Sequence, residues 1–334
     1  MPRVAVLMPA RDARRTVVAA ARSILRQSMR DLALVAVEDG SRDDTAAVLF
    51  RLAEGDRRVL VVRGKGEGIA VALNLGLQRC DAEVVARMDA DDLAHPRRLE
   101  CQLAALVALP EAWAVGSQVR PFPRREIGVG MRRYVEWVNG LTSPEQVARD
   151  LLVEAPLVHP ASALRREALE RLSGWRDGPF PEDYDLWLRA CEAGGVLSNV
   201  ARPLLLWRDG PGRATRQDPR YRLARFVALK CGYLRRTVLA GRDEVALWGA
   251  GPTGKAFADA LREEGVRVAL FLDVDKKKVG RVLRGATVLS YEEAARARGL
   301  PLLVAVGSPG ARPLIRRELA RRGFTELRDY WCVS

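Results

Sequence analysis

The sequence contains no apolar run that approaches the ~20 residues of a membrane-spanning helix, and its N-terminus has no hydrophobic signal-peptide core. Both absences predict a cytoplasmic protein. Cysteine is scarce and odd in number, and no two of the five residues form a Cys-x-x-Cys pair. This pattern excludes a disulfide framework and predicts buried or incidental reduced thiols.

Lysine is also rare, with six residues, so the formal net charge of +13 is carried mostly by arginine. The excess is spread along the chain, because residues 243–334 carry 16 basic and 12 acidic side chains, a net of only +4. Aromatic residues do not alternate with the basic ones as a nucleic-acid stacking platform requires. We therefore predict no nucleic-acid partner and leave open a peripheral contact with the inner face of a membrane.

Three carboxylates follow one of the apolar runs. The run extends from Val84 to Met88, and Asp89, Asp91 and Asp92 come directly after it. Ligands of open α/β sheets lie at the carboxyl ends of strands, and closely spaced carboxylates repel one another unless a cation or solvent separates them. Hard oxygen ligands suit Mg²⁺ or Mn²⁺. The pattern favours a divalent-metal site, and the alternative is a polar loop in which Asp92 caps a following helix.

Short apolar runs alternate with helical patterns through the first hundred residues. The runs cover residues 3–8, 31–37, 59–62 and 84–88, with apolar residues at helical spacing between them. This β-α-β-α-β-α-β order predicts an α/β fold with a doubly wound, mostly parallel sheet and functional loops at the strand ends. A glycine-rich stretch, residues 64–68, opens the third helix but does not match Gly-x-x-x-x-Gly-Lys-Ser/Thr, so it is a weak phosphate signature.

These segments together resemble family 2 glycosyltransferases, which have the GT-A fold. The resemblance extends over residues 1–215 and rests on the order and spacing of several motifs. They are VAVLMPARD at 4–12, VEDGS at 37–41 with Asp44-Thr45, ALN at 72–74, ARMDADD at 86–92 with His95-Pro96 and Arg98-Leu99, and PEDYDLWLR at 181–189. The sequence departs from the family at Arg11, where tyrosine is frequent, and at Glu38, where many members have aspartate.

The resemblance implies an enzyme of the hexosyltransferase type that moves a sugar from a nucleotide-sugar donor, usually a UDP-sugar, to an acceptor hydroxyl with inversion. The acceptor would be a saccharide or a lipid-linked glycoconjugate. Asp39 would accept a hydrogen bond from the base in a pocket lined by Pro9 and Arg11, and Asn74 would be a further donor contact. The alternatives are that Asp39 is a turn residue before Gly40 and that Asn74 faces the edge of the core.

The same resemblance implies roles for the carboxylates. Asp91 would bind Mn²⁺ or Mg²⁺ directly, and Asp89 would bind it through water or hold the ribose. His159 would approach the diphosphate or complete the metal coordination, although a lone histidine is also common as a structural residue. Asp183 would take the proton of the attacking hydroxyl, with Glu182 positioning it or the acceptor. The alternative for this acidic pair is capping of a helix N-terminus.

Two further segments each fit more than one structure. Residues 120–150 are rich in arginine and are an acceptor-side excursion, a membrane-facing amphipathic segment or an amphipathic helix packed on the core. Residues 209–219 contain glycine, proline and arginine, and are either a mobile lid whose arginines reach the diphosphate or a solvated loop. A helix is expected at 221–239, so we predict a first domain at 1–220 and a helical linker at 221–242.

A smaller, Rossmann-like domain is predicted at 243–334. A strand there leads into the turn Gly249-x-Gly251-x-x-Gly254, and Asp273 lies 22 residues beyond Gly251, where a ribose-binding acid is expected. The segment holds only half of a dinucleotide site, and Pro252 removes an N–H from the turn. These conflicts favour a structural, homo-oligomerising or regulatory role over nucleotide binding. The rival functions are an NAD(P)-dependent oxidoreductase and a nucleotide-sensing protein acting through this domain.

Overall fold

The computed structural model describes residues 2–210 and 212–334, which form two compact units. The first unit comprises the residues up to Ala148, Pro156–Gly178 and Glu182–Gln217, and the second comprises Arg149–Ala155, Pro179–Pro181 and Asp218–Ser334. Helix α10 (Leu223–Arg236), which was predicted as a linker, is grouped with the second unit. The predicted domain boundaries at 220 and 243 stay a prediction. In the described part of the chain, no helix is both long and apolar enough to cross a membrane.

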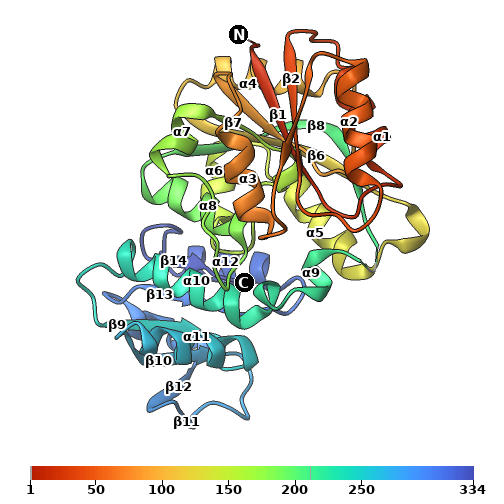
Figure 1. The fold of residues 1–334 in the computed structure, drawn as a ribbon. Coiled ribbons are helices and arrows are strands. Elements are labelled where there is room, and N and C mark those ends of the chain that lie inside the picture. Colours follow the sequence, from red (N-terminus) through yellow and green to blue (C-terminus); the bar gives the residue numbers. More distant parts are fainter. Residues whose placement is uncertain (1, 211) are drawn as a thin grey trace. The chain divides into compact units, whose positions relative to one another are not determined.

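The first unit is built on an eight-stranded sheet with the order β3-β2-β1-β4-β7-β6-β8-β5 (Figure 1). Its strands are β1 (Val4–Ala10), β2 (Leu32–Glu38), β3 (Val59–Arg63), β4 (Val84–Arg87), β5 (Leu93–Ala94), β6 (Ala112–Phe122), β7 (Ala163–Arg165) and β8 (Val196–Arg208). Strands β1 to β4 are parallel to one another, and β7 runs antiparallel between β4 and β6. The predicted α/β fold with a mostly parallel sheet is confirmed.

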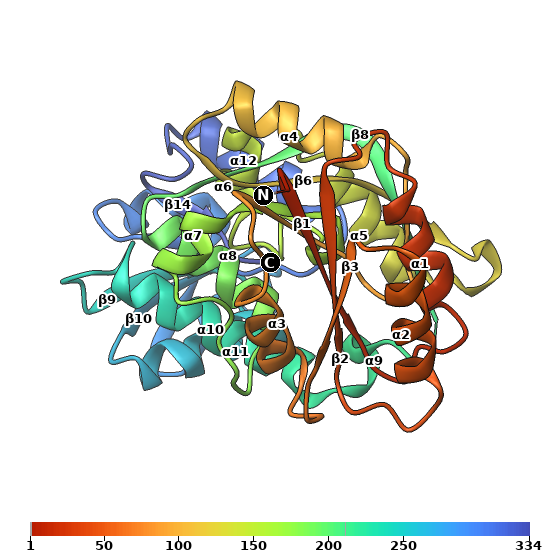
Figure 2. The same ribbon diagram turned by 45° about the horizontal axis from the view of Figure 1, so that its top comes forward.

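Helices cover both faces of this sheet. They are α1 (Val17–Leu25), α2 (Thr45–Gly55), α3 (Ile69–Leu77), α4 (Arg98–Ala108), α5 (Val129–Asn139), α6 (Pro144–Asp150), α7 (Arg166–Arg171), α8 (Glu182–Glu192) and α9 (Ala214–Gln217). Helices α1 and α2 lie side by side on the face opposite α3 (Figures 1 and 2). Residues alternate between the faces along a strand. Accordingly, Val6 and Met8 belong to the core cluster that includes α1, whereas a Cβ at Gly76 of α3 would collide with Leu7.

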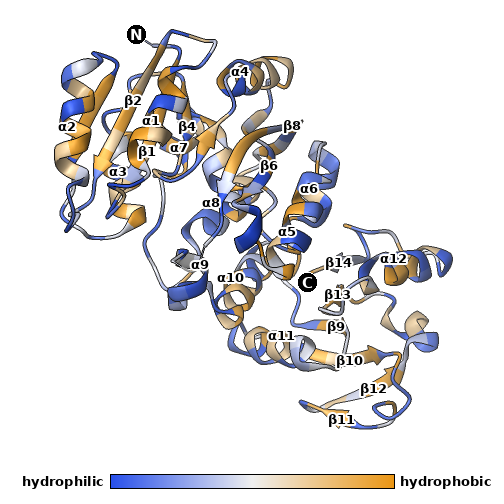
Figure 3. Ribbon diagram, turned by 90° about the vertical axis from the view of Figure 1, so that its right-hand side faces the viewer, coloured by the Kyte–Doolittle hydropathy of each residue, from blue (hydrophilic) through white to orange (hydrophobic). Residues whose placement is uncertain are grey.

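The parallel pairing brings three strand ends to one edge of the sheet. Ala10 at the end of β1 pairs with Glu38 of β2, and Leu7 pairs with Arg87 of β4. The strands themselves are hydrophobic, as Figure 3 shows for β1 and β4, and the polar residues follow where the strands end. This is the edge at which doubly wound sheets bind their ligands.

The second unit contains a six-stranded sheet with the order β11-β12-β10-β9-β13-β14. Its strands are β9 (Glu244–Trp248), β10 (Arg267–Asp273), β11 (Val282–Leu283), β12 (Ala286–Ser290), β13 (Leu302–Val304) and β14 (Tyr330–Cys332), and its longer helices are α10, α11 (Pro252–Glu263) and α12 (Ala311–Arg321). All pairs except β11–β12 are parallel. The β9–turn–α11–β10 order confirms the predicted Rossmann-like topology.

One lysine is buried within the second unit. The Nζ of Lys230, on α10, donates hydrogen bonds to the carbonyl oxygens of Val153 at 2.9 Å and Val333 at 3.0 Å. Burial lowers the pKa of Lys230 to about 8, and the nearby charge of Glu154 opposes this shift. The lysine thereby ties residues 149–155 to the C-terminal end of the chain.

We expect Lys230→Met to lower the free energy of unfolding by about 3 kcal/mol, because methionine fills the space but leaves two carbonyls and Glu154 without their cationic partner. Urea denaturation would measure the loss. Lys255→Met is the control, since Lys255 is exposed on α11, and it should change stability by less than about 0.5 kcal/mol. Equal effects of the two substitutions would show that the buried ammonium contributes nothing.

Candidate active site

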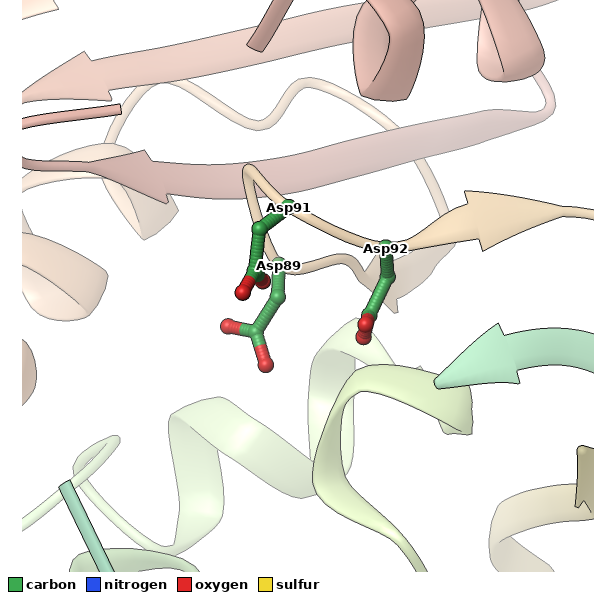
Figure 4. Close-up of side chains that lie close together, drawn as sticks. All are labelled: Asp89, Asp91 and Asp92. Carbon is green, nitrogen blue, oxygen red and sulfur yellow. The ribbon is translucent and has the colours of Figure 1, made fainter. Parts of the chain in front are cut away.

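Asp89, Asp91 and Asp92 form a group of carboxylates directly after β4. One oxygen from each lies within 4.8 Å of the others, and all three side chains turn to the same side of the loop (Figure 4). Asp92 is buried, whereas Asp89 and Asp91 are half-buried. The structure thus brings together the two aspartates predicted as metal ligands and adds Asp92 to them.

Asp92 does not cap a helix, so that alternative is wrong. The next residues, Leu93–Ala94, form strand β5, and α4 begins only at Arg98. The Oδ1 of Asp92 instead accepts a hydrogen bond of 2.7 Å from the backbone N–H of Arg208, at the end of β8. Its Oδ2 is buried and has no hydrogen-bond partner among the described residues. A buried carboxylate oxygen without a partner is costly unless an ion or water satisfies it.

Burial and mutual repulsion disfavour the charged form of this group. Burial raises the pKa of Asp91 to about 6, the charge of Asp89 adds to the shift, and Arg208, Arg213 and Arg87 oppose it. The pKa of Asp92 is also raised well above its ordinary value, first by burial and then by the charges of Asp89 and Asp91. An all-oxygen set of ligands with uncompensated negative charge suits Mg²⁺ or Mn²⁺. The residues present therefore fit a divalent metal.

The raised pKa of Asp91 predicts how stability depends on pH without metal. Between its ordinary value of 3.8 and its folded value of about 6, the folded protein holds a proton that the unfolded chain has lost. This contribution therefore reduces stability as pH rises through that range. In EDTA, we expect the stability of Asp91→Asn relative to wild type to be about 1 kcal/mol greater at about pH 7 than at about pH 5. Urea denaturation at both values measures it, and a difference that does not change with pH contradicts the prediction.

Arg87 contacts the carboxylate group, and the sequence analysis did not single it out. Its buried guanidinium forms an ion pair with Asp89. Burial lowers the pKa of Arg87, but the charges of Asp89, Glu182 and Asp92 outweigh this effect and raise it overall. Arg98, equally buried, donates a hydrogen bond of 2.6 Å to the carbonyl oxygen of Arg87. The sequence signal was available, because an arginine inside a short buried strand needs a partner.

Asn74 and His159 lie in a second arrangement centred on Trp175. The Nδ2 of Asn74 donates to the carbonyl oxygen of Trp175 at 2.7 Å, and its Oδ1 accepts from the Trp175 N–H at 2.9 Å. The indole Nε1 of Trp175 then donates to Nε2 of His159 at 3.0 Å. Burial and the charge of Arg87 lower the pKa of His159, which is therefore neutral with its proton on Nδ1.

This arrangement differs from the predicted one. His159 is not part of the carboxylate group, and metal ligation through its Nε2 would require breaking the bond to Trp175. Asn74 uses its amide oxygen and nitrogen on the Trp175 backbone rather than presenting them at the strand ends. The sequence pattern could not show these contacts, since 101 residues separate Asn74 from Trp175 and 16 residues separate His159 from Trp175.

Glu182 and Asp183 occupy the first turn of α8. Glu182 is buried and Asp183 is half-exposed, and the Oδ1 of Asp183 accepts a hydrogen bond of 2.8 Å from the N–H of Tyr184. The helix is fixed by a buried ion pair of 2.7 Å between Asp185 and Arg189. Arg189 also donates to the carbonyl oxygens of residues 172 and 174, directly before Trp175. The first turn of α8 is therefore held at the loop that carries Trp175.

Arg11 and Asp39 contact a glycine-rich loop at the ends of β1 and β2, and Pro9 lies within β1, paired with Val37. The Oδ1 of buried Asp39 accepts from the N–H of Gly66 at 2.9 Å, and Arg11 donates to the carbonyl oxygen of Gly66 at 3.3 Å. A Cβ at Gly64 would lie 2.7 Å from the same Asp39 oxygen. Gly64 is therefore required for its close approach to Asp39, and Gly66 and Gly68 adopt positive φ angles, so local geometry accounts for this loop without a bound phosphate.

The segment 209–219 folds onto a buried aspartate, and of its residues Pro211 lies outside the described part. Asp209 forms ion pairs of 3.8 Å with Arg213 and 2.9 Å with Arg216. The Arg213 guanidinium also stacks 4.1 Å from the centre of the Trp207 ring. Both Arg208 and Arg213 contribute positive charge at Asp91. The guanidinium groups of Arg208 and Arg213 are thus close enough to the aspartate group for their positive charges to act on it.

The predicted C-terminal residues also come together, at the carboxyl ends of β9 and β10. A Cβ at Gly249 would lie 2.6 Å from the oxygen of Ala305, and one at Gly254 would collide with Gly249, so packing accounts for both glycines. Gly251 faces open space. The carboxylate of Asp273 accepts hydrogen bonds from the N–H of Ala250 at 2.8 Å, the N–H of residue 275 and the ammonium of residue 278. It therefore stabilises the turn itself.

Comparisons with known proteins agree with this fold. Residues 5–173 match the model of Glycosyl transferase family 2. The putative glycosyltransferase EpsE of Bacillus subtilis is 32% identical over 266 residues, which are 78% of this chain and 91% of that protein. The amylovoran biosynthesis glycosyltransferase AmsE of Erwinia amylovora is 31% identical over 189 residues, 56% of this chain and 68% of that protein.

Among solved structures, residues 1–349 of S. aureus TarS in complex with UDP align with a TM-score of 0.55 at 15% identity. The alignment covers 77% of this chain and 70% of that one, and at this identity it supports the fold alone. The family match and the relatives support the enzyme class as well. The chain therefore belongs to glycosyl transferase family 2 and is a glycosyltransferase with a GT-A fold.

Proposed function

We propose that the protein is a metal-dependent, inverting glycosyltransferase that uses a UDP-sugar and transfers the sugar to a hydroxyl of a saccharide or lipid-linked acceptor. The observation that carries this proposal is the Asp89, Asp91 and Asp92 group, close enough to Arg208 and Arg213 for their charges to lower the pKa of Asp91. Buried carboxylates and adjacent guanidinium groups are the two requirements for holding a cation and a diphosphate together.

The residues around the site have distinct proposed roles. Asp91 and Asp89 would hold Mn²⁺ or Mg²⁺, with the unpartnered Oδ2 of Asp92 on the buried side. When bound, the ion neutralises the diphosphate as the leaving group. Arg208 and Arg213 bind diphosphate oxygens, because planar guanidinium groups match phosphate geometry.

The remaining roles concern the base and the acceptor. Asp39 accepts a hydrogen bond from the base, with Pro9 and Arg11 at the same strand ends. Asp183 accepts the proton of the attacking hydroxyl, and buried Glu182 orients the first turn of α8. For Asn74 and His159, the contacts with Trp175 favour positioning roles over direct donor or metal contacts.

The names of relatives and of proteins that share the fold are consistent with a nucleotide-sugar donor and a saccharide or lipid-linked acceptor. TarS has been solved with UDP and with UDP-GlcNAc. A mannosyltransferase of Pyrobaculum calidifontis, which shares the fold with a TM-score of 0.50 at 22% identity, has been solved with GDP-Man and Mn²⁺. A relative from Escherichia coli, 26% identical over 202 residues, is named a UDP-Gal:alpha-D-GlcNAc-diphosphoundecaprenol beta-1,3-galactosyltransferase. AmsE is named for amylovoran biosynthesis. A polysaccharide or lipid-linked product is consistent with these names. We propose that the enzyme acts in the cytoplasm, at the inner face of the membrane.

Thermal-shift titration tests the proposal. Uridine, guanosine and nicotinamide nucleotides and their sugar conjugates would be added with and without Mn²⁺, since a ligand that binds the folded state raises the melting temperature. We expect stabilisation by UDP or one UDP-sugar that requires Mn²⁺. Stabilisation by GDP-sugars alone would change the donor, and stabilisation by NAD alone would contradict the proposed site.

A further inference from the structure

A cavity in the second unit lies outside the proposed active site. It has a volume of about 200 Å³, and its lining includes Arg242, Arg298, Pro301, Phe324, Arg328, Asp329 and Trp331. Arg242, Pro301 and Arg328 come just before β9, β13 and β14, whose parallel pairing aligns their starts. The cavity therefore opens at the amino edge of this sheet, whereas the Gly249–Gly254 turn is at the carboxyl edge.

The charge in this cavity is not balanced. Arg328 is paired with Asp329, whose carboxylate it contacts at 2.9 Å. The side chains of Arg242 and Arg298 are hydrogen-bonded to backbone carbonyl oxygens, and the charge of Arg298 also helps to lower the pKa of Asp329, so this one carboxylate faces more than one guanidinium group. Arg242 reaches only the carbonyl oxygen of Gly299, at 3.5 Å, which is the limit of a hydrogen bond. The cavity therefore carries a net charge of about +2.

The side chain of Arg298 is held by one hydrogen bond and one ring contact. It donates to the carbonyl oxygen of Arg322 at 2.6 Å, and its guanidinium stacks 4.9 Å from the centre of the Phe324 ring. A guanidinium fixed by one carbonyl and one ring keeps further N–H groups available and loses little side-chain entropy on binding. Phe324 is buried beneath it, and Trp331 is half-buried on β14.

We propose that this cavity binds a compact phosphorylated ligand, a phosphate monoester or a diphosphate group. Clustered arginines attract phosphate strongly because they offer paired N–H donors to its oxygens. The volume of about 200 Å³ is below the 300–1,000 Å³ of pockets for drug-sized ligands, so a dinucleotide does not fit and a phosphate headgroup does. The aromatic and proline side chains provide contact for a small apolar portion next to the phosphate. The phosphate can belong to a free metabolite or to a lipid headgroup.

The experiment uses the full chain in EDTA, so that metal-bridged binding at Asp89, Asp91 and Asp92 does not contribute. Inorganic pyrophosphate is the probe for a free ligand, and phosphatidylcholine vesicles with and without phosphatidic acid are the probe for a headgroup. Calorimetry and vesicle co-sedimentation measure binding, and hydrogen exchange locates it. The test variant combines Arg242→Gln with Arg298→Gln. Arg317→Gln is the control, because Arg317 is exposed on α12 and does not line the cavity.

We expect one probe to slow hydrogen exchange at residues 298–301 and 324–331, and the double substitution to weaken its binding about tenfold or more. The control should bind as wild type does. Protection by pyrophosphate identifies a free phosphorylated ligand, and protection only by phosphatidic acid vesicles identifies a headgroup. If neither probe protects these residues, or if the double variant binds as tightly as the control, the proposal is wrong. Because the readout is binding at the second unit, it is independent of sugar transfer.

Discussion

Asp183→Asn is expected to lower kcat by about 10²–10⁴-fold and to leave donor binding unchanged. Asparagine cannot accept the proton of the acceptor hydroxyl, but its side-chain oxygen can still accept the N–H of Tyr184, so the first turn of α8 should be retained. Initial rates of UDP release with saturating donor and acceptor measure kcat. The donor-induced thermal shift measures binding independently of turnover.

Glu167→Gln provides the control, because Glu167 is an exposed carboxylate on α7 with the same chemical change. Its kcat and melting temperature should match wild type. If Asp183→Asn retains more than about a tenth of wild-type kcat, the loss is below the range expected for a general base and the base must be another group. Glu182→Gln would then be examined, although the burial of Glu182 beside Arg87 favours a positioning role.

The fold was predictable because its signals are local. The parallel strands β1, β2 and β4 are buried on both faces, so each reads as a short apolar run, and polar residues follow at its end. Val84–Arg87 followed by Asp89 and Asp91 is such a case. The strands β6 and β8 are less evident in the sequence, because polar residues such as Arg120 and Asn199 interrupt their apolar runs.

The side-chain contacts within the site were not predictable, since they depend on residues distant in sequence. Arg87 pairs with Asp89 but also responds to Glu182, and the bonds of Trp175 to Asn74 and His159 join three separate elements. No period or spacing encodes such contacts. The sequence can show that a charged side chain lies in a buried strand, but it cannot show which residue pairs with that side chain.

The packing of α5 shows which of the predicted structures residues 120–150 adopt. Val135 and Val138 of α5 belong to the hydrophobic core of the first unit, whereas Arg132 and Arg133 are exposed. This is the amphipathic helix packed on the core, one of the three structures that the sequence allowed. Gly64, in the loop after β3, shows the opposite case, because its close approach to Asp39 could not be inferred from composition.

Asp91→Asn is expected to abolish Mn²⁺-dependent stabilisation by the donor and to lower kcat/KM by about 10³-fold, because a metal ion supplies several kcal/mol of stabilisation to a charged leaving group. A neutral amide binds a hard divalent cation more weakly than a carboxylate does. Titration of Mn²⁺ against the melting temperature, with UDP present, measures the first effect. Initial rates of sugar transfer at several Mn²⁺ concentrations measure the second.

The apo protein distinguishes this loss from misfolding. Because the charged form of Asp91 is disfavoured by burial and by Asp89, removing that charge should make metal-free Asp91→Asn at least as stable as wild type near neutral pH. Loss of activity together with an unchanged or raised melting temperature therefore indicates loss of the metal, not of the fold. Asp92→Asn completes the comparison: if the unpartnered Oδ2 is a ligand, its Mn²⁺ affinity falls as well. Full Mn²⁺-dependent activity in Asp91→Asn would show that the cation, if required, is held elsewhere.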